Sequence, residues 1–479
     1  MGTVRAAVIY SALARFFMRF IGLGTTMVVA RLLTPEEIGT FAIASAIVMV
    51  MAEIRLLGAG AYLIRESEIT PAKVRSTLGL TLIVSWSMGL LVLLSALPAA
   101  RFYELSELGW IFAILSISFF IAPYISIPMT LLARNLCFKH QFRILAASSI
   151  ISSATTIGMV LSGFSFWSLA VGQLLNPLSQ FLIFCLYRPY LMQYWPSFRN
   201  LKPIARIGIF NSLTFLIRRA TVAAPDMIIG KAGSTRDVAM FSRGLGFIEF
   251  VSQTVIKGVQ PVAFPYLSQV RREGGNLLEA YTRASVMLGA FVVPILGVGS
   301  IASLPTIRLF FGDQWDAAAP LASIVAIWAM CRSVHWFSRE LLMGSGREDL
   351  MLLREALPFF ILIPLILLAY PYGLQAVAVS FLATGVVDVI FTSVLLWKVT
   401  GLNLIYFFRS WIGNVATLMS CMGTTWAWSQ VVSFQATPPV TVVLLLALTT
   451  PFVWLGTLGI FRNPLYFEIR DAIPLTRNN

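Results

Sequence analysis

The sequence predicts an all-α membrane protein that crosses the bilayer about fourteen times. Of its 479 residues, 58% are hydrophobic and only 12% are charged, and the mean hydropathy is +0.83. Such a composition leaves too few polar side chains to cover a water-soluble globule. A spanning helix needs about 20 mostly apolar residues. Segments of this kind are centred near residues 18, 46, 88, 120, 153, 177, 217, 251, 297, 328, 362, 386, 416 and 449.

An internal repeat predicts that the first twelve helices form two six-helix lobes. The stretch Val28–Phe41 aligns without a gap on Ile228–Phe241, and the same offset of 200 residues places Arg19 on Arg219. Because six is an even number of helices, both copies have the same orientation, which indicates a pseudo-twofold axis along the membrane normal. Polar breaks divide the chain into an N-lobe, a C-lobe and a final helix pair with a tail, at residues 1–195, 196–400 and 401–479.

The basic residues of the predicted loops indicate that both ends of the chain are cytoplasmic. With the N-terminus inside, 22 Lys and Arg residues fall on the cytoplasmic side and five on the other, as the positive-inside rule requires. The net charge of +14 is therefore largely a topology signal, and we expect no nucleic acid as a partner. The predicted loops are too short to hold a soluble catalytic domain, so we do not expect an enzyme.

The repeat also predicts how its second helix begins. Thr34 is a suitable N-cap, Pro35 suits the first helical position, and Glu37 stands three residues after the cap. Together these residues form the pattern of a capping box. The second copy has Ser234 and Asp237 at the equivalent positions. A direct role of these acids in binding a substrate is the alternative interpretation.

Basic residues inside the apolar segments predict a hydrated cavity for an anionic substrate. A charge at the bilayer centre costs on the order of 2.5 to 3.5 kcal/mol, and the acidic residues within the spans are too few to pair with all the basic ones. Guanidinium groups favour phosphate or diphosphate because they bind it through two parallel hydrogen bonds. The predicted substrate-binding residues are Arg15, Arg19, Arg218, Arg219, Lys257 and Arg332. For Arg15, near the inner interface, the alternative is that the side chain extends to the lipid headgroups.

Three intramembrane acids and one histidine are candidates for coupling transport to an ion. Asp226, Glu249 and Asp388 could change protonation near the basic residues, and His335 is the corresponding titrating base. Static salt bridges to neighbouring arginines explain the three acids equally well. The four cysteines have no paired spacing, which argues against a metal site. We expect no cofactor, and a proton or sodium gradient is the open alternative for the driving force.

Three motifs carry a resemblance to a known family. They are Ala30–Phe41, Leu132–Lys139 and Phe311–Pro320. Their sequences and order are similar to those of the polysaccharide transport family, the Wzx-type oligosaccharide flippases of the multidrug/oligosaccharidyl-lipid/polysaccharide exporter superfamily. The resemblance implies two lobes around a central cavity that the first, second, seventh, eighth and last two helices line.

The resemblance also implies a cargo and a location. The cargo is a polyprenyl-diphosphate-linked oligosaccharide, moved between leaflets of the bacterial inner membrane for exopolysaccharide, capsule or O-antigen assembly. Expected partners are this lipid-linked oligosaccharide, membrane lipid and a polysaccharide polymerase or export machinery. The last two helices have no charge between Arg409 and Arg462, which suits a groove for the prenyl chain.

Three other functions remain as alternatives. A multidrug exporter of the same superfamily should have an acidic and aromatic cavity. A membrane glycan polymerase or ligase should have catalytic groups at the outer face, where the predicted loops are short. A lipid II flippase of cell-wall synthesis would share the cationic cavity, but the three motifs favour the polysaccharide branch. For the favoured function we expect alternating access by rocking of the two lobes.

Overall fold

Helices joined by loops make up the part of the chain that the computed structural model describes, residues 2–55, 59–66, 68–187, 194–347 and 349–472, where no strand occurs. The chain divides into two compact units, Met1–Ser242 (unit 1) and Arg243–Asn479 (unit 2). The all-α fold class is confirmed. The lobe boundaries near residues 195 and 400 stay predictions.

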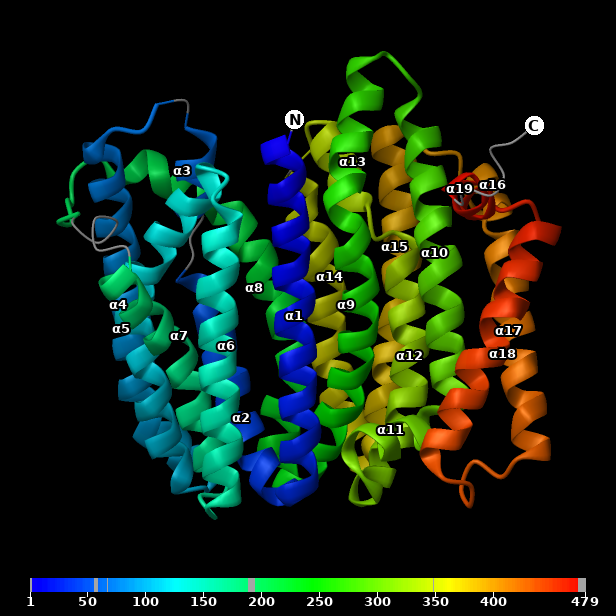
Figure 1. The fold of residues 1–479 in the computed structure, drawn as a ribbon, viewed down its shortest axis with the longest axis horizontal. Coiled ribbons are helices and arrows are strands. Elements are labelled where there is room, and N and C mark those ends of the chain that lie inside the picture. Colours follow the sequence, from blue (N-terminus) through cyan, green and yellow to red (C-terminus); the bar gives the residue numbers. More distant parts are fainter. Residues whose placement is uncertain (1, 56–58, 67, 188–193, 348, 473–479) are drawn as a thin grey trace. The chain divides into compact units, whose positions relative to one another are not determined.

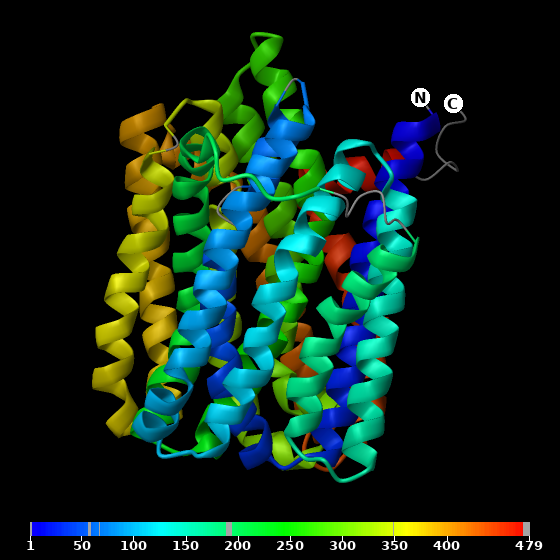
Figure 2. The same cartoon turned by 90° about the vertical axis from the view of Figure 1, so that its left-hand side faces the viewer.

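Unit 1 contains eight complete helices among its described residues and the start of a ninth. They are α1 (Gly2–Leu32), α2 (Pro35–Ile54), α3 (Ala59–Arg65), α4 (Pro71–Tyr103), α5 (Glu107–Arg134), α6 (Phe138–Leu161), α7 (Trp167–Tyr187), α8 (Leu201–Ala232) and the start of α9 (Thr235–Arg272). Helix α4 packs along α5, and α6 packs on α1 and α7. Figures 1 and 2 show α4, α5, α6 and α7 running side by side along the long direction of unit 1.

Unit 2 contains the rest of α9 and the later elements. They are α10 (Leu277–Ile301), α11 (Ser303–Phe311), η2 (Asp313–Ala318), α12 (Ala319–Val334), α13 (Ser338–Gly344), α14 (Asp349–Ala369), η3 (Tyr370–Tyr372), α15 (Leu374–Thr400), α16 (Leu404–Ser410), α17 (Ile412–Val431), α18 (Pro439–Ile460) and α19 (Pro464–Ala472). Helix α12 packs on both α10 and α15, and α17 packs on α10 and α18. Figure 1 shows the short helices α16 and α19 at one end of unit 2 and α11 at the other.

The helices agree with the predicted membrane spans. Each of the fourteen predicted centres falls on a helix, and ten spans within the described residues are long and apolar enough to cross a membrane. The protein is therefore a multi-pass membrane protein. The ten do not include α1, α8, α9 or α17, so the total of fourteen stays a prediction.

The repeat is visible in the helix ends. Helix α1 ends at residue 32 and α2 begins at residue 35, while α8 ends at residue 232 and α9 begins at residue 235. The predicted capping box is confirmed, because Glu37 N–H donates to Thr34 Oγ1 at 3.3 Å and Thr34 N–H donates to Glu37 Oε2 at 2.8 Å. In the second copy, Asp237 N–H donates to Ser234 Oγ at 3.1 Å.

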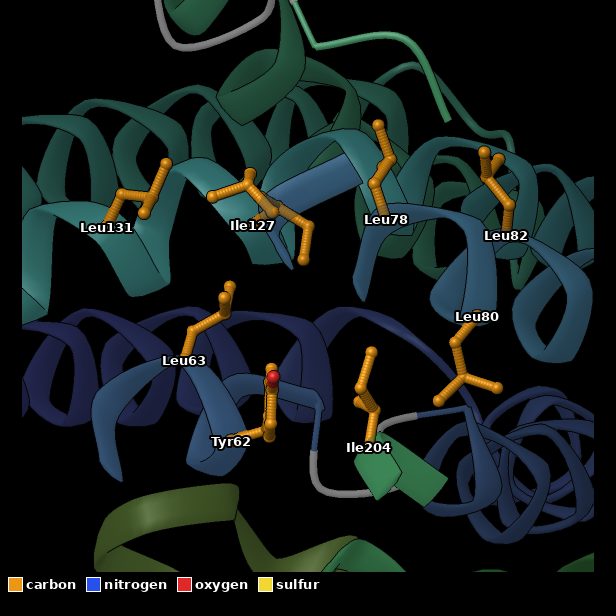
Figure 3. Packing of buried hydrophobic residues seen from close by; sticks show 9 residues of the cluster. Tyr62, Leu63, Leu78, Leu80, Leu82, Ile127, Leu131 and Ile204 are labelled. Atoms are coloured by element: carbon orange, nitrogen blue, oxygen red, sulfur yellow. The ribbon is translucent and has the colours of Figure 1, made fainter. Parts of the chain in front are cut away.

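A buried apolar cluster fixes the short helix α3, whose residues the hydropathy pattern places in a loop. Figure 3 shows side chains of α4 and α5 facing those of α3, with one residue of α8 beside them. The labelled members are Tyr62, Leu63, Leu78, Leu80, Leu82, Ile127, Leu131 and Ile204. Arg134 Nη1 donates to the carbonyl oxygens of Leu63 at 2.7 Å and Glu66 at 2.6 Å. These bonds satisfy carbonyls that a helix end leaves unpaired, so Arg134 in the second family motif has a structural role.

The third motif, Phe311–Pro320, also has a structural role. Trp315 is fully buried, and the Arg243 guanidinium lies 4.7 Å from the ring centroids of both Phe311 and Trp315. Arg308 holds Asp316 through two bonds, Nε to Oδ1 at 2.8 Å and Nη2 to Oδ2 at 2.6 Å. These contacts fasten η2 to α11 and α9.

Candidate functional site

Unit 2 contains a row of alternating charges that joins four helices, and its side chains are only 9–21% exposed. Arg332 of α12 lies 3.8 Å from Glu249 of α9 (Nη1 to Oε1) and 3.8 Å from Glu355 of α14 (Nη2 to Oε2). Arg354 of α14 lies 3.0 Å from Glu355 (Nη1 to Oε1) and 3.7 Å from Asp388 of α15 (Nη2 to Oδ2). We call these five residues the ionic row. Buried charges of opposite sign placed in alternation compensate part of each other's desolvation cost.

The ionic row brings together three of the residues that the sequence selected, Glu249, Arg332 and Asp388. The sequence does not mark Arg354 and Glu355 as interior residues, because the positive-inside pattern places Arg354 beside a cytoplasmic loop. Arg354 is only 8% exposed. For Glu249 and Asp388 the geometry is that of the salt-bridge alternative, and the roles of all three predicted residues in transport stay predictions.

His335 lies in a closed aromatic and polar environment in unit 2. Its Nδ1 is 2.8 Å from the Tyr281 hydroxyl oxygen, and its Nε2 is 2.8 Å from Ser393 Oγ. The ring stacks on Phe407 with centroids 4.9 Å apart, and the residue is 2% exposed. Because both ring nitrogens have partners, the contacts favour a structural role, and the predicted coupling role remains untested.

Unit 1 contains a polar cavity of about 510 Å³ between α2, α4, α5, α6 and α7. Its lining is rich in hydroxyl and amide side chains, and its single charged residue among the described lining is Arg55. The polar lining residues are Arg55, Thr81, Ser85, Ser118, Ser126, Ser152, Gln173, Asn176 and Gln180. We call it the polar cavity. Its volume is in the range of small-molecule sites, about 300 to 1,000 Å³.

Local hydrogen bonds hold part of this lining. Ser85 Oγ donates to the Phe119 carbonyl at 2.6 Å, and Ser152 Oγ donates to the Gly172 carbonyl at 2.7 Å. A hydroxyl that donates in this way still has acceptor capacity for a ligand. Arg55 lies at the C-terminal end of α2 with its guanidinium 5.4 Å from the Phe119 ring centroid, and its buried Nε has no hydrogen-bond partner among the described residues.

The polar cavity could not be found from the sequence. The positive-inside pattern assigns Arg55 to a cytoplasmic loop, and serine, threonine and glutamine are common enough in spanning helices to give no signal singly. The lining residues are distributed over five helices, which only the packed fold brings together.

The predicted basic residues of unit 1 lie on α1 and α8. Arg19, Arg218 and Arg219 are half-buried. The side chain of Arg15, and that of Lys257 on α9, lie outside the described residues. A joint role of these residues in binding an anion therefore stays a prediction.

Asp226 of α8 differs from the two predicted acids of the ionic row, Glu249 and Asp388. Ser242 Oγ donates to its Oδ2 at 3.3 Å, whereas its Oδ1 is buried with no hydrogen-bond partner within the described part of the chain. A carboxylate that is satisfied on one oxygen only is a better candidate for proton or cation binding than one held by an arginine. Asp226 thus remains the strongest of the predicted coupling acids.

Unit 2 contains an apolar pocket of about 450 Å³ between α9, α10, α17 and α18. Aromatic and aliphatic side chains line it, among them Phe247, Phe291, Leu446 and Trp454. Trp454 Nε1 donates to the carbonyl of Ala290 at 2.7 Å, which fixes α18 against α10. We call this site the apolar pocket. It involves both helices of the final pair, where the sequence predicted a groove for a hydrocarbon chain.

The fold is that of membrane transporters with known structures. The chain superimposes on the lipid II flippase MurJ in an inward closed conformation with a TM-score of 0.73, at 16% identity, over 97% of this chain and 100% of that one. The MATE multidrug transporter DinF-BH gives a TM-score of 0.55 at 18% identity, over 83% of this chain and 95% of that one. At these identities the likeness shows the fold alone.

Within that fold, the chain belongs to a defined sequence family. The family described as "Polysaccharide biosynthesis protein" matches residues 28–320, more than half of the chain, and the protein is a member of it. The resemblance predicted from the three motifs is thereby confirmed.

Three curated relatives have biosynthesis or transport names. The teichuronic acid biosynthesis protein TuaB of Bacillus subtilis (strain 168) is 23% identical over 299 residues, 61% of each chain. The succinoglycan biosynthesis transport protein ExoT of Rhizobium meliloti (strain 1021) is 22% identical over 68% of this chain and 66% of its own. The lipopolysaccharide biosynthesis protein WzxC of Escherichia coli (strain K12) is 20% identical over 80% of this chain and 78% of its own. The alignments with TuaB and ExoT span slightly less than two thirds of those relatives.

Proposed function

We propose that the protein is a flippase for polyprenyl-diphosphate-linked oligosaccharide repeat units, which it moves from the cytoplasmic to the periplasmic leaflet of a bacterial inner membrane. The product would serve exopolysaccharide, capsule or O-antigen assembly. The observation that carries the proposal is that one chain of this family contains both an arginine-bearing polar cavity and an apolar pocket. An amphiphile with a hydrated glycan and a long hydrocarbon chain needs both kinds of surface.

The polar cavity supplies chemistry suited to sugars and phosphate. Its hydroxyl and amide groups can donate to and accept from sugar hydroxyls. Arg55 provides a guanidinium whose Nε has no hydrogen-bond partner within the described residues, and such a donor suits a diphosphate or an acidic sugar. We propose that the predicted residues Arg15, Arg19, Arg218, Arg219 and Lys257 bind the same anionic group, together with Arg55.

The apolar pocket suits the other end of the cargo. Aromatic and aliphatic side chains of α10 and α18 line most of it, so it offers a prenyl chain apolar contact. Arg332, in contrast, is held by Glu249 and Glu355, so we give it no part in the binding of cargo.

Transport would proceed by alternating access. The site opens to the cytoplasm, binds the diphosphate and glycan, and then reopens to the periplasm, with both chain ends in the cytoplasm. A membrane potential that is negative inside favours the export of an anion by roughly 2.3 kcal/mol per charge per 100 mV. Asp226 is the carboxylate that we assign to any coupling proton or sodium ion.

The second candidate, a multidrug exporter, shares the fold of DinF-BH. Binding of cationic drugs would require carboxylates in the cavity, whereas the charged residue of the described polar lining is Arg55. An enzymatic function is disfavoured by the transporter fold.

The experiment measures lipid-linked repeat units in cells that lack the gene. Complementation with the wild type, Arg55→Ala, Arg219→Ala or the control Lys398→Ala gives four strains. Lys398 is exposed at the end of α15. We expect wild type and Lys398→Ala to relieve a build-up in the cytoplasmic leaflet, and the two arginine variants to fail at normal membrane abundance. Normal glycan export without any build-up in the deletion strain would overturn the proposal.

A further inference from the structure

A third pocket, of about 480 Å³, lies at the end of unit 2 where α16 and α19 pack against α10 (Figure 1). Three arginines from three places in the chain line it: Arg283 of α10, Arg409 of α16 and Arg462 just after α18. Tyr406 and Ser410 add hydroxyl groups. We call it the basic pocket. It shares no lining residue with the polar cavity or the apolar pocket.

The basic pocket has an excess of positive charge. Arg283 Nη2 donates to Glu468 Oε1 at 2.8 Å, so this arginine is already paired. Glu279 is the acid among the described lining residues. The guanidinium groups of Arg409 and Arg462 are exposed, and neither has an ion-pair or hydrogen-bond partner within the described part of the chain. Two arginines thus remain available for an anion.

The backbone holds Arg462 in an unusual conformation. Its N–H donates to the carbonyl of Gly459 at 3.1 Å, and the N–H of Asn463 donates to the carbonyl of Leu458 at 2.9 Å. These two bonds form a Schellman motif, in which Arg462 occupies the position that glycine usually takes. Its φ of 48° is in the left-handed region, which costs energy for a residue with a side chain. Strain of this kind at a charged residue that lines a pocket is consistent with a functional role.

Buried amides fix this conformation from the other side. Asn463 is 3% exposed, and its Nδ2 donates to Asn414 Oδ1 at 2.8 Å. Asn414 Nδ2 in turn donates to the carbonyl of Val286 at 2.9 Å. The chain around Arg462 is therefore anchored to α10 and α17, and the backbone of the arginine is preorganised at the pocket.

The surroundings of the basic pocket are apolar and exposed. Ile412 lines the pocket and is 56% exposed, while Ile405 and Ile460, which precede the lining residues Tyr406 and Phe461 in the sequence, are 82% and 79% exposed. In a multi-pass membrane protein, such side chains at helix ends face lipid. A charged recess that is bordered by lipid-facing isoleucines fits a ligand with an anionic headgroup and hydrocarbon chains.

We propose that the basic pocket binds the phosphate of an anionic phospholipid of the surrounding bilayer. Arg409 and Arg462 hold the phosphate oxygens, and the acyl chains lie along Ile405, Ile412 and Ile460. Basic pockets between membrane helices are suited to such headgroups because the arginines gain charge-assisted hydrogen bonds at the bilayer surface. This inference does not rest on the proposed transport activity, since the pocket is separate from the polar cavity and the apolar pocket.

The test measures lipid binding to the purified full chain in a neutral detergent, by native mass spectrometry. The probes are phosphatidylglycerol, phosphatidylcholine with the same acyl chains, polyprenyl diphosphate and inorganic phosphate. The variant is Arg409→Gln with Arg462→Gln, and the matched control is Lys398→Gln with Arg470→Gln, which removes two charges outside the pocket. The melting temperature without lipid reports whether each variant is folded. A second variant, Arg409→Lys with Arg462→Lys, keeps the charge.

We expect phosphatidylglycerol to bind the wild type and the control equally, and the glutamine variant about 30-fold more weakly, as two surface arginines predict. The lysine variant should recover part of the affinity. Equal binding to the glutamine variant and the wild type would overturn the proposal. Binding of phosphatidylcholine as tight as that of phosphatidylglycerol would also overturn it, and so would saturation of the pocket by inorganic phosphate alone. A third contrary outcome is a pocket that binds polyprenyl diphosphate but not phosphatidylglycerol.

Discussion

The two copies of the repeated helix start, residues 28–41 and 228–241, both lie in unit 1 and share their helix ends, whereas the two units differ in the sites that they contain. In both copies a hydroxyl residue caps a helix that begins three residues after the preceding helix ends. Yet unit 1 contains a polar cavity of about 510 Å³, and unit 2 contains an apolar pocket of about 450 Å³. The repeated pattern therefore accounts for two similar helix starts, whereas the side chains that line each site determine what that site can bind.

The charges of the ionic row also differ from those of Arg55 and Asp226 in how completely they are paired. Unit 2 holds Arg354 between Glu355 and Asp388, while unit 1 leaves Arg55 Nε and Asp226 Oδ1 without hydrogen-bond partners in the described residues. Paired buried charges stabilise a fold once they are present, and incompletely satisfied ones are available for a ligand. We infer that the charges of the ionic row serve stability, whereas Arg55 and Asp226 are the candidates for binding.

The largest effect on stability is expected for Arg354→Met. The substitution leaves buried Asp388 without its cation and leaves Glu355 with Arg332 alone, and breaking a buried pair in this way costs about 3 to 5 kcal/mol. Thermal unfolding in detergent would measure this loss. Arg347→Met is the matched control seven residues earlier, because that arginine is exposed and pairs with Asp349 at the surface, and it should leave the melting temperature unchanged. Similar melting temperatures for both variants would contradict the structural role of the ionic row.

A smaller effect is expected for Gly39→Ala, which gives the first copy the alanine that the second has as Ala239. A Cβ at residue 39 would collide with the backbone carbonyl of Thr235, and overpacking of this kind costs about 1 to 3 kcal/mol. The midpoint of thermal unfolding is the measurement. Gly423→Ala, on α17, serves as the control because nothing lies within 4 Å of the added Cβ. A variant at residue 39 as stable as this control would show that the two helix starts do not pack closely.

The smallest effect is expected at the caps. Thr34→Ala removes the side-chain acceptor for Glu37 N–H and should cost about 1 kcal/mol. Thr34→Ser keeps the hydroxyl and should restore most of the loss in the same unfolding assay. Ser234→Ala tests the equivalent cap of the second copy. If alanine and serine at residue 34 give the same stability, the capping box contributes nothing measurable.

Much of the fold could be predicted from the sequence, because it depends on local patterns. Apolar segments of spanning length identified the helices. The capping-box pattern of Thr34–Glu37 located the start of α2. The sequence predicted only three of the five residues of the ionic row. The contact between Arg354 and Asp388 could not be predicted, because it joins residues 34 positions apart in the sequence. Arg354 is also close in sequence to a polar loop, so its charge was interpreted as a sign that this loop is cytoplasmic. Arg55 was missed for the same reason, and the neutral lining of the polar cavity has no pattern along the chain.

The bonds of Arg134 and Arg308 to backbone oxygens have a consequence for natural variation. Arg134 holds the carbonyls of Leu63 and Glu66, and Arg308 Nη1 donates to the carbonyl of Gln435 at 2.7 Å. Every amino acid offers a carbonyl, so the partner segments can change their side chains freely while the two arginines cannot. Among homologues these arginines should be invariant opposite variable partners, and covariation between positions would fail to detect either contact.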